Sequence, residues 1–300
     1  MSIVLDGKAI ADKLTRSVAD EINSIKKANA RFAPGLAAVL VGEDPASKVY
    51  VRNKKKSAIG IGMEALDYYL PESTTQKELE EYVSKLSEDV SVDGILVQLP
   101  LPTHIDQEKI IDAISPDKDV DGLHPYNVGL LVKGQPRFVP ATPAGVQHIL
   151  VESEIEVSGK HVVICGRSEI VGKPLGLLLM QRNKGANATV TVCHSRTENL
   201  QNITAQADIL IAAVGQPNFI RADMVKKGAV VIDVGTNRVQ DMSRKSGYRL
   251  VGDVDFENVK NISSAITPVP GGVGPMTIAM LLKNTLESAK RKNLVFDKIT

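Results

Sequence analysis

The sequence lacks the features of a secreted or membrane-bound protein. No apolar run reaches the roughly 18 residues that a membrane-spanning helix needs. The stretch from Met1 to Asp6 has no basic segment followed by an apolar one, so no signal peptide is predicted. The early acidic residues Asp6 and Asp12 argue against a transit peptide. We therefore expect a soluble protein of the cytoplasm.

An excess of charge of one sign is also missing. The chain has 36 basic and 35 acidic residues and a formal net charge of +1. Its basic residues are not gathered into one segment, apart from the short run Lys54 to Lys56. This gives no electrostatic basis for binding nucleic acid or an anionic membrane, and we expect neither as a partner.

Cysteine is scarce. The two cysteines, Cys165 and Cys193, form no CxxC pair and have no histidine pair at ligand spacing, so no metal site is predicted. Each lies at the end of an apolar run, where a reduced and buried thiol is the usual state. This pattern fits a reducing compartment.

The 300 residues contain short apolar runs that alternate with helical patterns, which is typical of an α/β protein with parallel sheets. The expected strands are 36–41, 63–70, 94–98, 161–165, 188–193, 207–214 and 229–234. The expected helices are 8–28, 47–60, 76–87, 105–114, 143–152, 175–181 and 276–292. A boundary at 140–144 predicts two domains, 1–140 and 141–275, of which the second has a Rossmann-type doubly wound parallel sheet.

Capping residues predict where three of these helices begin. Ser47 is the expected N-cap of the second helix, and Thr74 or Thr75 that of the third. Thr142 is expected to cap a helix that starts at Pro143, because proline is favoured in the first turn.

Tyr50 and Lys54 lie four residues apart in the second predicted helix and therefore share a face. A phenol beside an amine can hold a flat substrate and move a proton, although a solvated surface helix explains the same residues. Gln98 ends a buried strand, at the edge of the sheet where ligands bind in open α/β folds. Its amide needs partners, which a ligand, a lysine or local backbone would supply.

The loop from Ser115 to His124 contains three aspartates and a glycine. It lacks the spacing and the closing glutamate of a calcium-binding EF-hand loop. We favour a loop that presents one carboxylate to a substrate.

Gly166 and Gly172 follow a strand and precede a helix, which is the context of a dinucleotide site. Their spacing is not GxGxxG, and a purely structural turn remains an alternative. After the next strand, positions 194–197 carry no acid for a ribose hydroxyl. Ser195 and Arg196, together with Arg167, instead fit a 2′-phosphate, so the sequence favours NADP over NAD.

Motifs along nearly the whole chain resemble one family, the bifunctional methylenetetrahydrofolate dehydrogenase/methenyltetrahydrofolate cyclohydrolases, or FolD family. The matching stretches are Tyr50-Val-x-x-Lys-x-Lys56, 94–102, 116–124 with Asn127 and Gly129, 166–174, 194–197, 233–237, 252–255 and 267–277. Ala141 departs from the family, in which many members have cysteine.

The resemblance implies an oxidation of 5,10-methylene-tetrahydrofolate with NADP and a hydrolysis of the product to 10-formyl-tetrahydrofolate. It implies a cleft between a folate domain and an NADP domain, a last helix that returns to the first domain, and a homodimer. The implied catalytic residues are Tyr50, Lys54, Gln98 and Asp121. The implied folate contacts are Tyr50, Asp121, Gly271, Gly272, Val273, Gly274 and Pro275. The implied cofactor contacts are Gly166, Arg167, Ser168, Ile170, Val171, Gly172, His194, Ser195, Arg196, Gly235 and Thr236.

In this interpretation Lys54 is the catalytic amine and Gln98 is its hydrogen-bond partner. We expect the neighbouring Lys55 and Lys56 to lower its pKa. Lys55 itself is expected to be solvated. Two other hypotheses remain, a dehydrogenase of a small acid similar to shikimate dehydrogenase, and an inactive folate- or nucleotide-binding module.

Overall fold

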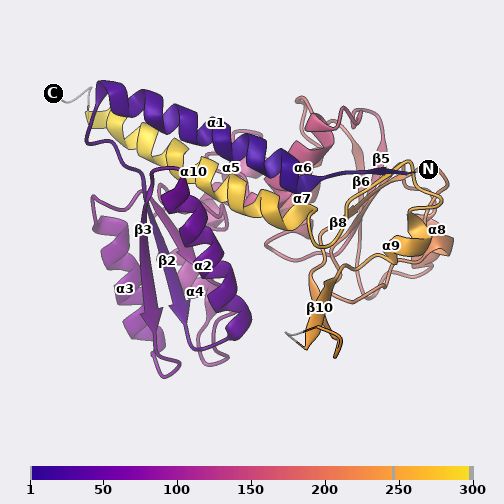
Figure 1. The fold of residues 1–300 in the computed structure, drawn as a ribbon, viewed down its shortest axis with the longest axis horizontal. Coiled ribbons are helices and arrows are strands. Elements are labelled where there is room, and N and C mark those ends of the chain that lie inside the picture. Colours follow the sequence, from indigo (N-terminus) through magenta and orange to yellow (C-terminus); the bar gives the residue numbers. More distant parts are fainter. Residues whose placement is uncertain (1, 245–246, 297–300) are drawn as a thin grey trace. The chain divides into compact units, whose positions relative to one another are not determined.

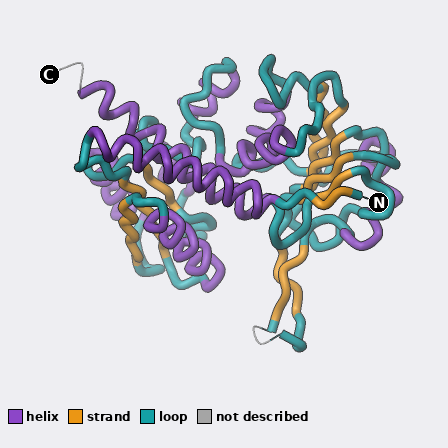
Figure 2. The backbone as a smooth tube through the Cα atoms, turned by 45° about the horizontal axis from the view of Figure 1, so that its top comes forward, coloured by secondary structure: helices purple, strands orange, loops and turns teal. Residues whose placement is uncertain are grey.

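The computed structural model describes residues 2–244 and 247–296. The chain forms two compact units. Unit 1 comprises Met1–Asp12 and Thr142–Thr277, and unit 2 comprises Lys13–Ala141 and Ile278–Thr300. Each contains a parallel β-sheet with helices packed against it (Figures 1 and 2). The predicted two-domain α/β fold is therefore confirmed.

Unit 2 is built on a three-stranded parallel sheet in the order β3-β2-β4. Its strands are β2 (Gly35–Val41), β3 (Glu64–Leu70) and β4 (Gly94–Val97). Every residue of β2 is buried, because helix α3 (Gln76–Glu88) covers one face and helix α2 (Pro45–Gly60) flanks the other (Figure 1). Burial on both faces explains why β2 is a continuous apolar run in the sequence.

Helix α2 begins earlier than predicted. Its N-cap is Asp44, whose carboxylate accepts a hydrogen bond from the Ser47 amide at 2.7 Å, and Pro45 occupies the first turn. Ser47 lies inside the helix and is buried, so its prediction as the cap was wrong. For α3 the predicted cap is confirmed, since Thr75 and Glu78 form a reciprocal capping box.

Two long helices lie side by side in unit 2 (Figures 1 and 2). They are α1 (Gly7–Ala28) and α10 (Val273–Phe296), and each also contributes a few residues to unit 1. Lys290 of α10 forms ion pairs with Glu21 of α1 at 2.6 Å and with Glu287 at 2.9 Å. Two shorter helices complete the unit, α4 (Gln107–Asp112) and α5 (Pro125–Val132).

Unit 1 is built on a six-stranded sheet in the order β1-β11-β8-β7-β5-β6, and every pairing in it is parallel. The strands are β1 (Ile3–Val4), β5 (His161–Cys165), β6 (Thr189–Cys193), β7 (Ile209–Ala212), β8 (Val230–Asp233) and β11 (Ala265–Ile266). The helical segments are α6 (Ala141–Glu152), α7 (Gly172–Leu179), α8 (Leu200–Thr204), α9 (Phe256–Val259) and the 3-10 turn η1 (Ala222–Met224).

Helix α6 and a β-hairpin of unit 1 differ from the sequence prediction. Helix α6 starts at Ala141, so Thr142 is not its cap; the Thr142 hydroxyl instead hydrogen-bonds that of Thr277 at 2.9 Å. An antiparallel hairpin of β9 (Asn237–Gln240) and β10 (Tyr248–Val251) was not predicted and is visible in Figure 1. Among the described helices of both units, none combines the length and apolarity of a bilayer span.

Candidate active site

The strand order of unit 2 places its polar side chains at one sheet edge. Strands β3 and β4 pair with opposite sides of β2, so the order in which strands are added to the sheet reverses at β2. In open α/β sheets, ligands bind beyond the carboxyl ends of the strands at such a switch point. Helix α2, with Tyr50 and Lys54, starts shortly after β2, and Gln98 follows β4 directly. The backbone N–H of Gln98 donates a hydrogen bond to Val39 O at 2.8 Å, which fixes this residue to β2.

Lys54 and Gln98 are in contact. The Lys54 ammonium donates to Gln98 Oε1 at 3.1 Å, and Gln98 Nε2 donates to the carbonyl of Leu99 at 2.7 Å. The second bond orients the amide so that its oxygen faces the lysine. Tyr50 lies one helical turn before Lys54 and is 41% exposed, which leaves its ring accessible to a ligand.

Asp121 reaches the same edge from a loop. The backbone of Lys118 accepts a bond from Ile95 N at 2.8 Å, and Asp119 bridges Ile95 in parallel, so the chain extends the sheet beside β4. Asp121 lies two residues beyond that bridge, level with the end of β4. Periodicity could not indicate this segment, since it is too short to show any.

Burial governs the charges of this pair. It lowers the pKa of Lys54, and the carboxylate of Asp121 opposes part of that effect. Burial likewise raises the pKa of Asp121, with the Lys54 ammonium opposing. A half-buried amine and a half-buried carboxyl thus influence each other's charge at this edge of the sheet. Desolvation takes the role that we had assigned to Lys55 and Lys56.

Lys55 keeps 43% of its side chain exposed to solvent, in line with its predicted solvation, but it also has a partner that was not predicted. Its ammonium pairs with Asp67 of β3 at 3.2 Å, and the Asp67 side chain is only 3% exposed. Lys56 is exposed.

The aspartates of the loop 115–124 serve separate purposes. Asp117 pairs with Arg137, and Asp121 interacts with Lys54. Asp119 is buried and accepts bonds from the amides of Leu123 (3.1 Å) and His124 (2.8 Å) and from Asn127 Nδ2 (2.8 Å). Burial raises the pKa of Asp119 to about 6. Asp119 therefore shapes the loop that presents Asp121, a role that the sequence analysis missed.

Unit 1 has its own switch point, because β6 and β7 pair with opposite sides of β5. Gly166 follows β5 with φ +133°, and a Cβ there would lie 2.2 Å from Ala213 O. A Cβ on Gly172, the first residue of α7, would lie 2.1 Å from Gly166 O. Both glycines are thus required by the turn itself. This turn also brings backbone amides and the N-terminus of α7 to the carboxyl edge of the sheet, where folds of this kind bind dinucleotides.

The residues predicted to contact the 2′-phosphate lie just beyond the carboxyl ends of β5 and β6. Ser195 and Arg196 follow β6 and are exposed, as is Arg167 after β5. His194 Nδ1 accepts a bond from the Arg196 amide at 3.2 Å, which holds this turn. Thr236 is exposed after β8. The exposed hydroxyls and guanidinium groups fit an anionic cofactor with a phosphate on its ribose.

Two buried carboxylates that we had not assigned organise the neighbouring loops. Asp253 accepts bonds from the amides of Val214 (2.6 Å) and Gly215 (2.9 Å), beyond β7. Asp233 accepts from the amides of Gly235, Asp253 and Val254, each at 2.9 Å. Burial raises the pKa of Asp233 to about 7. In the sequence, both aspartates lie in short stretches that match the family, 233–237 and 252–255. Hydrophobic periodicity gives no indication of their role.

The glycine-rich segment 271–275 also belongs to unit 1, and only its first two residues form a loop, because α10 begins at Val273 rather than at the predicted position 276. Gly271 has φ +106°, and its carbonyl accepts a bond from Lys8 N at 2.9 Å. A Cβ on Gly272 would lie 2.5 Å from Pro268 O, so this position also requires glycine. The role of this segment in folate binding stays a prediction.

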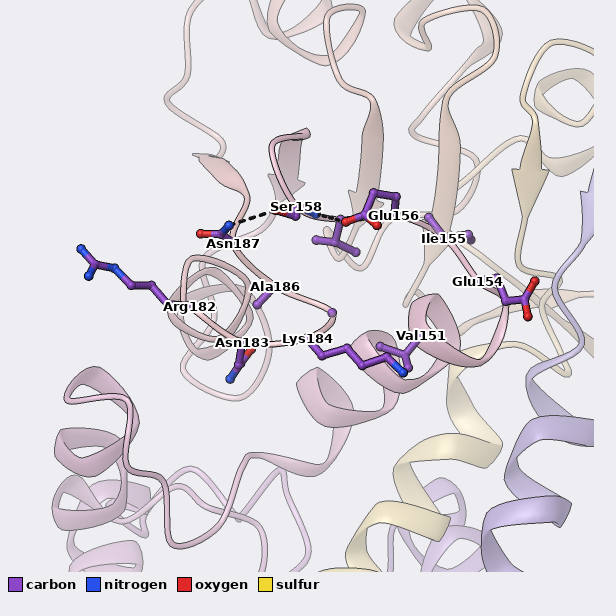
Figure 3. Close-up of a pocket in the computed structure, with 12 residues that line it drawn as sticks. Val151, Glu154, Ile155, Glu156, Ser158, Arg182, Asn183, Lys184, Ala186 and Asn187 are labelled. Atoms are coloured by element: carbon purple, nitrogen blue, oxygen red, sulfur yellow. Dashed lines mark hydrogen bonds between the residues drawn. The ribbon is translucent and has the colours of Figure 1, made fainter.

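An open hollow of about 700 Å³ lies elsewhere in unit 1. Figure 3 draws the residues that line it. The hollow lies beside the amino ends of β5 and β6, opposite to the switch point, and includes Glu156, Ser158 and Asn187. Asn187 donates to Ser158 Oγ at 2.9 Å, and Arg182 points outward (Figure 3). Because these groups satisfy each other or face solvent, the candidate site remains at the carboxyl edges.

Unit 1 has a sheet edge whose two glycines suit a dinucleotide, and unit 2 has a half-buried lysine bonded to an amide near a carboxyl. These features are typical of an α/β oxidoreductase with an additional acid–base group. The family models agree. Residues 5–121 match "Tetrahydrofolate dehydrogenase/cyclohydrolase, catalytic domain", and residues 140–293 match the NAD(P)-binding domain of the same family. The chain belongs to the tetrahydrofolate dehydrogenase/cyclohydrolase family.

Relatives cover nearly the whole chain. It is 54% identical to the bifunctional protein FolD of Acetivibrio thermocellus over 96% of both chains, and 56% identical to that of Salinibacter ruber over 96% of this chain and 95% of the relative. The solved FolD of Campylobacter jejuni is 48% identical, with TM-score 0.91 over 97% of this chain and all of its own. The Trypanosoma brucei enzyme, solved with NADP cofactor and inhibitor, is 42% identical, with TM-score 0.93 over 97% and 98%.

Proposed function

We propose that the protein oxidises 5,10-methylene-tetrahydrofolate with NADP to 5,10-methenyl-tetrahydrofolate and hydrolyses this product to 10-formyl-tetrahydrofolate. The observation that carries the proposal is the Lys54 amine, bonded to Gln98 at 3.1 Å and held beside Asp121. Because the chain belongs to the tetrahydrofolate dehydrogenase/cyclohydrolase family, we prefer this function to that of a small-acid dehydrogenase.

The oxidation places few demands on acid–base groups. NADP, when bound, accepts the hydride from the one-carbon bridge of the folate. The folate nitrogens stabilise the cation that forms, so the protein mainly has to orient the folate. We assign that task to the exposed ring of Tyr50, which stacks on the folate, and to Asp121, which holds the pterin edge.

The hydrolysis requires proton transfers, and Lys54 is equipped for them. Its lowered pKa increases the fraction of neutral amine near pH 7, and a neutral amine can take a proton from the attacking water. Gln98 Oε1 accepts a hydrogen bond from the ammonium and equally from the neutral amine, which still carries N–H groups, so it holds the side chain in both states. The segment 271–275 is assigned to the folate as well.

We propose that residues 1–140, with the last helix, carry the folate chemistry and that residues 141–275 bind NADP. The cofactor contacts are Gly166, Arg167, Ser168, Ile170, Val171, Gly172, His194, Ser195, Arg196, Gly235 and Thr236. Their support is the position of each segment beyond a strand end of the same sheet.

We further propose a homodimer that forms through unit 1. Its edge strand β6 carries Val192, which is 39% exposed, and nearby Met180 is 52% exposed. Sedimentation tests this. The near-zero net charge supports the absence of nucleic acid as a partner. The free, buried Cys165 and Cys193 support a reducing compartment, the cytoplasm.

An absorbance time course with methylene-tetrahydrofolate and NADP tests the proposal. We expect reduced cofactor to appear first and the methenyl intermediate to decay into 10-formyl-tetrahydrofolate. Purified protein that turns over neither methylene- nor methenyl-tetrahydrofolate would be an inactive binding module instead.

A further inference from the structure

Helix α2 carries two adjacent lysines that reach in different directions. The helix packs on β2 and β3, and Val51 and Ala58 on its inner side are fully buried. At about 100° per residue, Lys54 lies roughly 60° to one side of Val51 and Lys55 roughly 40° to the other. The two lysines therefore flank the buried stripe of the helix.

Their partners flank the central strand. Lys54 donates to Gln98, at the end of β4, and Lys55 pairs with Asp67 on β3 at 3.2 Å. Since the sheet order is β3-β2-β4, the helix is attached to the strands on both sides of β2. A rotation that lengthens one of these contacts also displaces the other.

The carboxylate of Asp67 is buried, whereas most aspartate side chains lie at the surface. Its side chain is 3% exposed, and Oδ1 has no hydrogen-bond partner within the described part of the chain. Oδ2 receives the Lys55 ammonium and, at 3.4 Å, the hydroxyl of Tyr69. A buried carboxylate of this kind holds its cation in place, because its separation leaves a charge without compensation.

We propose that the Lys55–Asp67 pair is a positioning element that sets the rotation of α2 and thereby holds the Lys54 amine on Gln98. The inference rests on the proposed function, since it concerns the amine of the hydrolytic step. Lys55 acts through Lys54, and the hydrolysis depends on the pair more than the hydride transfer does.

The first test is the variant Lys55→Met, compared with Lys55→Met/Asp67→Leu and Lys55→Arg. Lys55→Met lowers the thermal midpoint and reduces cyclohydrolase kcat on the order of tenfold, with a smaller effect on dehydrogenase kcat. The double variant regains thermal stability, because an apolar pair replaces the unpaired charge, but its cyclohydrolase kcat stays low. Lys55→Arg, which keeps the ion pair, retains the activity.

The matched control is Lys77→Met, which breaks the exposed Lys77–Glu81 pair of α3 at 3.8 Å and leaves both activities unchanged. If the double variant recovers activity together with stability, Lys55 has a structural role only and the proposal is overturned. An undiminished cyclohydrolase rate in Lys55→Met overturns it as well.

A second readout does not depend on turnover. Reductive ¹³C-methylation labels the lysines, and the Lys54 NMR signal is identified by its loss in Lys54→Arg. In both variants with Lys55→Met, we expect the pKa of Lys54 to move up towards that of an exposed lysine. If the titration of Lys54 is unchanged in these variants, the positioning role of Lys55 is refuted. If instead the wild-type protein has no cyclohydrolase activity, only the proposed function is refuted, because the titration tests the positioning role independently.

Discussion

Three consecutive lysines, alike in composition, have three different environments in the structure. Lys54 contacts Gln98 and interacts with Asp121, Lys55 pairs with Asp67, and Lys56 is exposed. Helical spacing alone identified Lys54 as the neighbour of Tyr50. It did not identify the partner of Lys55, because Asp67 is distant in sequence and lies in a strand with no recognisable charge pattern.

The substitution Lys54→Met tests the chemistry at this residue. We expect cyclohydrolase activity to fall by about 10²-fold or more, since the proton-transfer group is lost, and dehydrogenase activity to fall less. Separate assays with methylene- and methenyl-tetrahydrofolate measure the two steps. Equal retention of both activities would contradict the role of Lys54.

Arg196→Ala tests the choice of cofactor. Removal of its guanidinium should raise KM for NADP by about tenfold, because a charged hydrogen bond to the 2′-phosphate is lost, and should change KM for NAD little. Steady-state kinetics with both cofactors give the ratio. The exposed Arg221, which follows β7 and precedes η1, provides a control as Arg221→Ala.

Asp119 should make stability depend on pH. Its pKa is raised from 3.8 to about 6 in the folded state, so the native protein binds more protons than the unfolded chain between these values. The free energy of unfolding therefore falls as pH rises through this window, by up to about 3 kcal/mol. In Asp119→Asn this part of the pH dependence should disappear. Urea unfolding at pH 4.5 and 7 compares the two proteins, and identical pH slopes would argue against it.

Among the secondary-structure elements, both sheets place the candidate site residues beyond the strand ends where the strand order reverses. The apolar runs predicted the central strands well, because burial on both faces leaves an uninterrupted pattern. The two-residue strands β1 and β11 escaped prediction, since their pairing joins residues 3–4 to 265–266 and has no local signature. The start of α2 was misplaced because Asp44 and Ser47 are both good caps and only the packing selects between them.

Gly166→Ala tests the turn between β5 and α7. Its Cβ would collide with Ala213 O at a φ of +133°, so we expect a loss of more than 2 kcal/mol in unfolding free energy and weaker NADP binding. Gly159→Ala is the matched control, since its φ is +73° but no atom lies within 4 Å of the added Cβ. It should cost about 1 kcal/mol and leave binding intact. Equal effects of the two substitutions would contradict the steric argument.

At the scale of the whole molecule, the last helix supports the loop of the candidate site in unit 2. Asn284 of α10 donates to the carbonyls of Val120 (2.8 Å) and Val139 (3.0 Å), and Ser288 donates to that of Asp117 (2.8 Å). The resemblance predicted that this helix returns to the first part of the chain. It did not predict which polar groups make the connection, because the carbonyls involved belong to irregular backbone.

Asn284→Ala should therefore weaken folate binding from a distance. Two carbonyls lose their donor, at an expected cost of about 2 kcal/mol in unfolding free energy, and the segment before Asp121 loosens. We expect KM for methylene-tetrahydrofolate to rise severalfold while KM for NADP changes little. Lys283→Ala, its exposed neighbour on α10, is the control. An unaltered KM for the folate would separate the helix from the site.

The shared helices α1 and α10 have a consequence for how the protein is made. Strand β1 and the start of α1 belong to unit 1, whose other residues are synthesised after position 141, and unit 2 needs the residues after 277. A ribosome must therefore release almost the entire chain before either sheet has all its neighbours. Chains terminated before α10 would expose the side of α1 that packs beside it, and such products should be early substrates for chaperones and proteases.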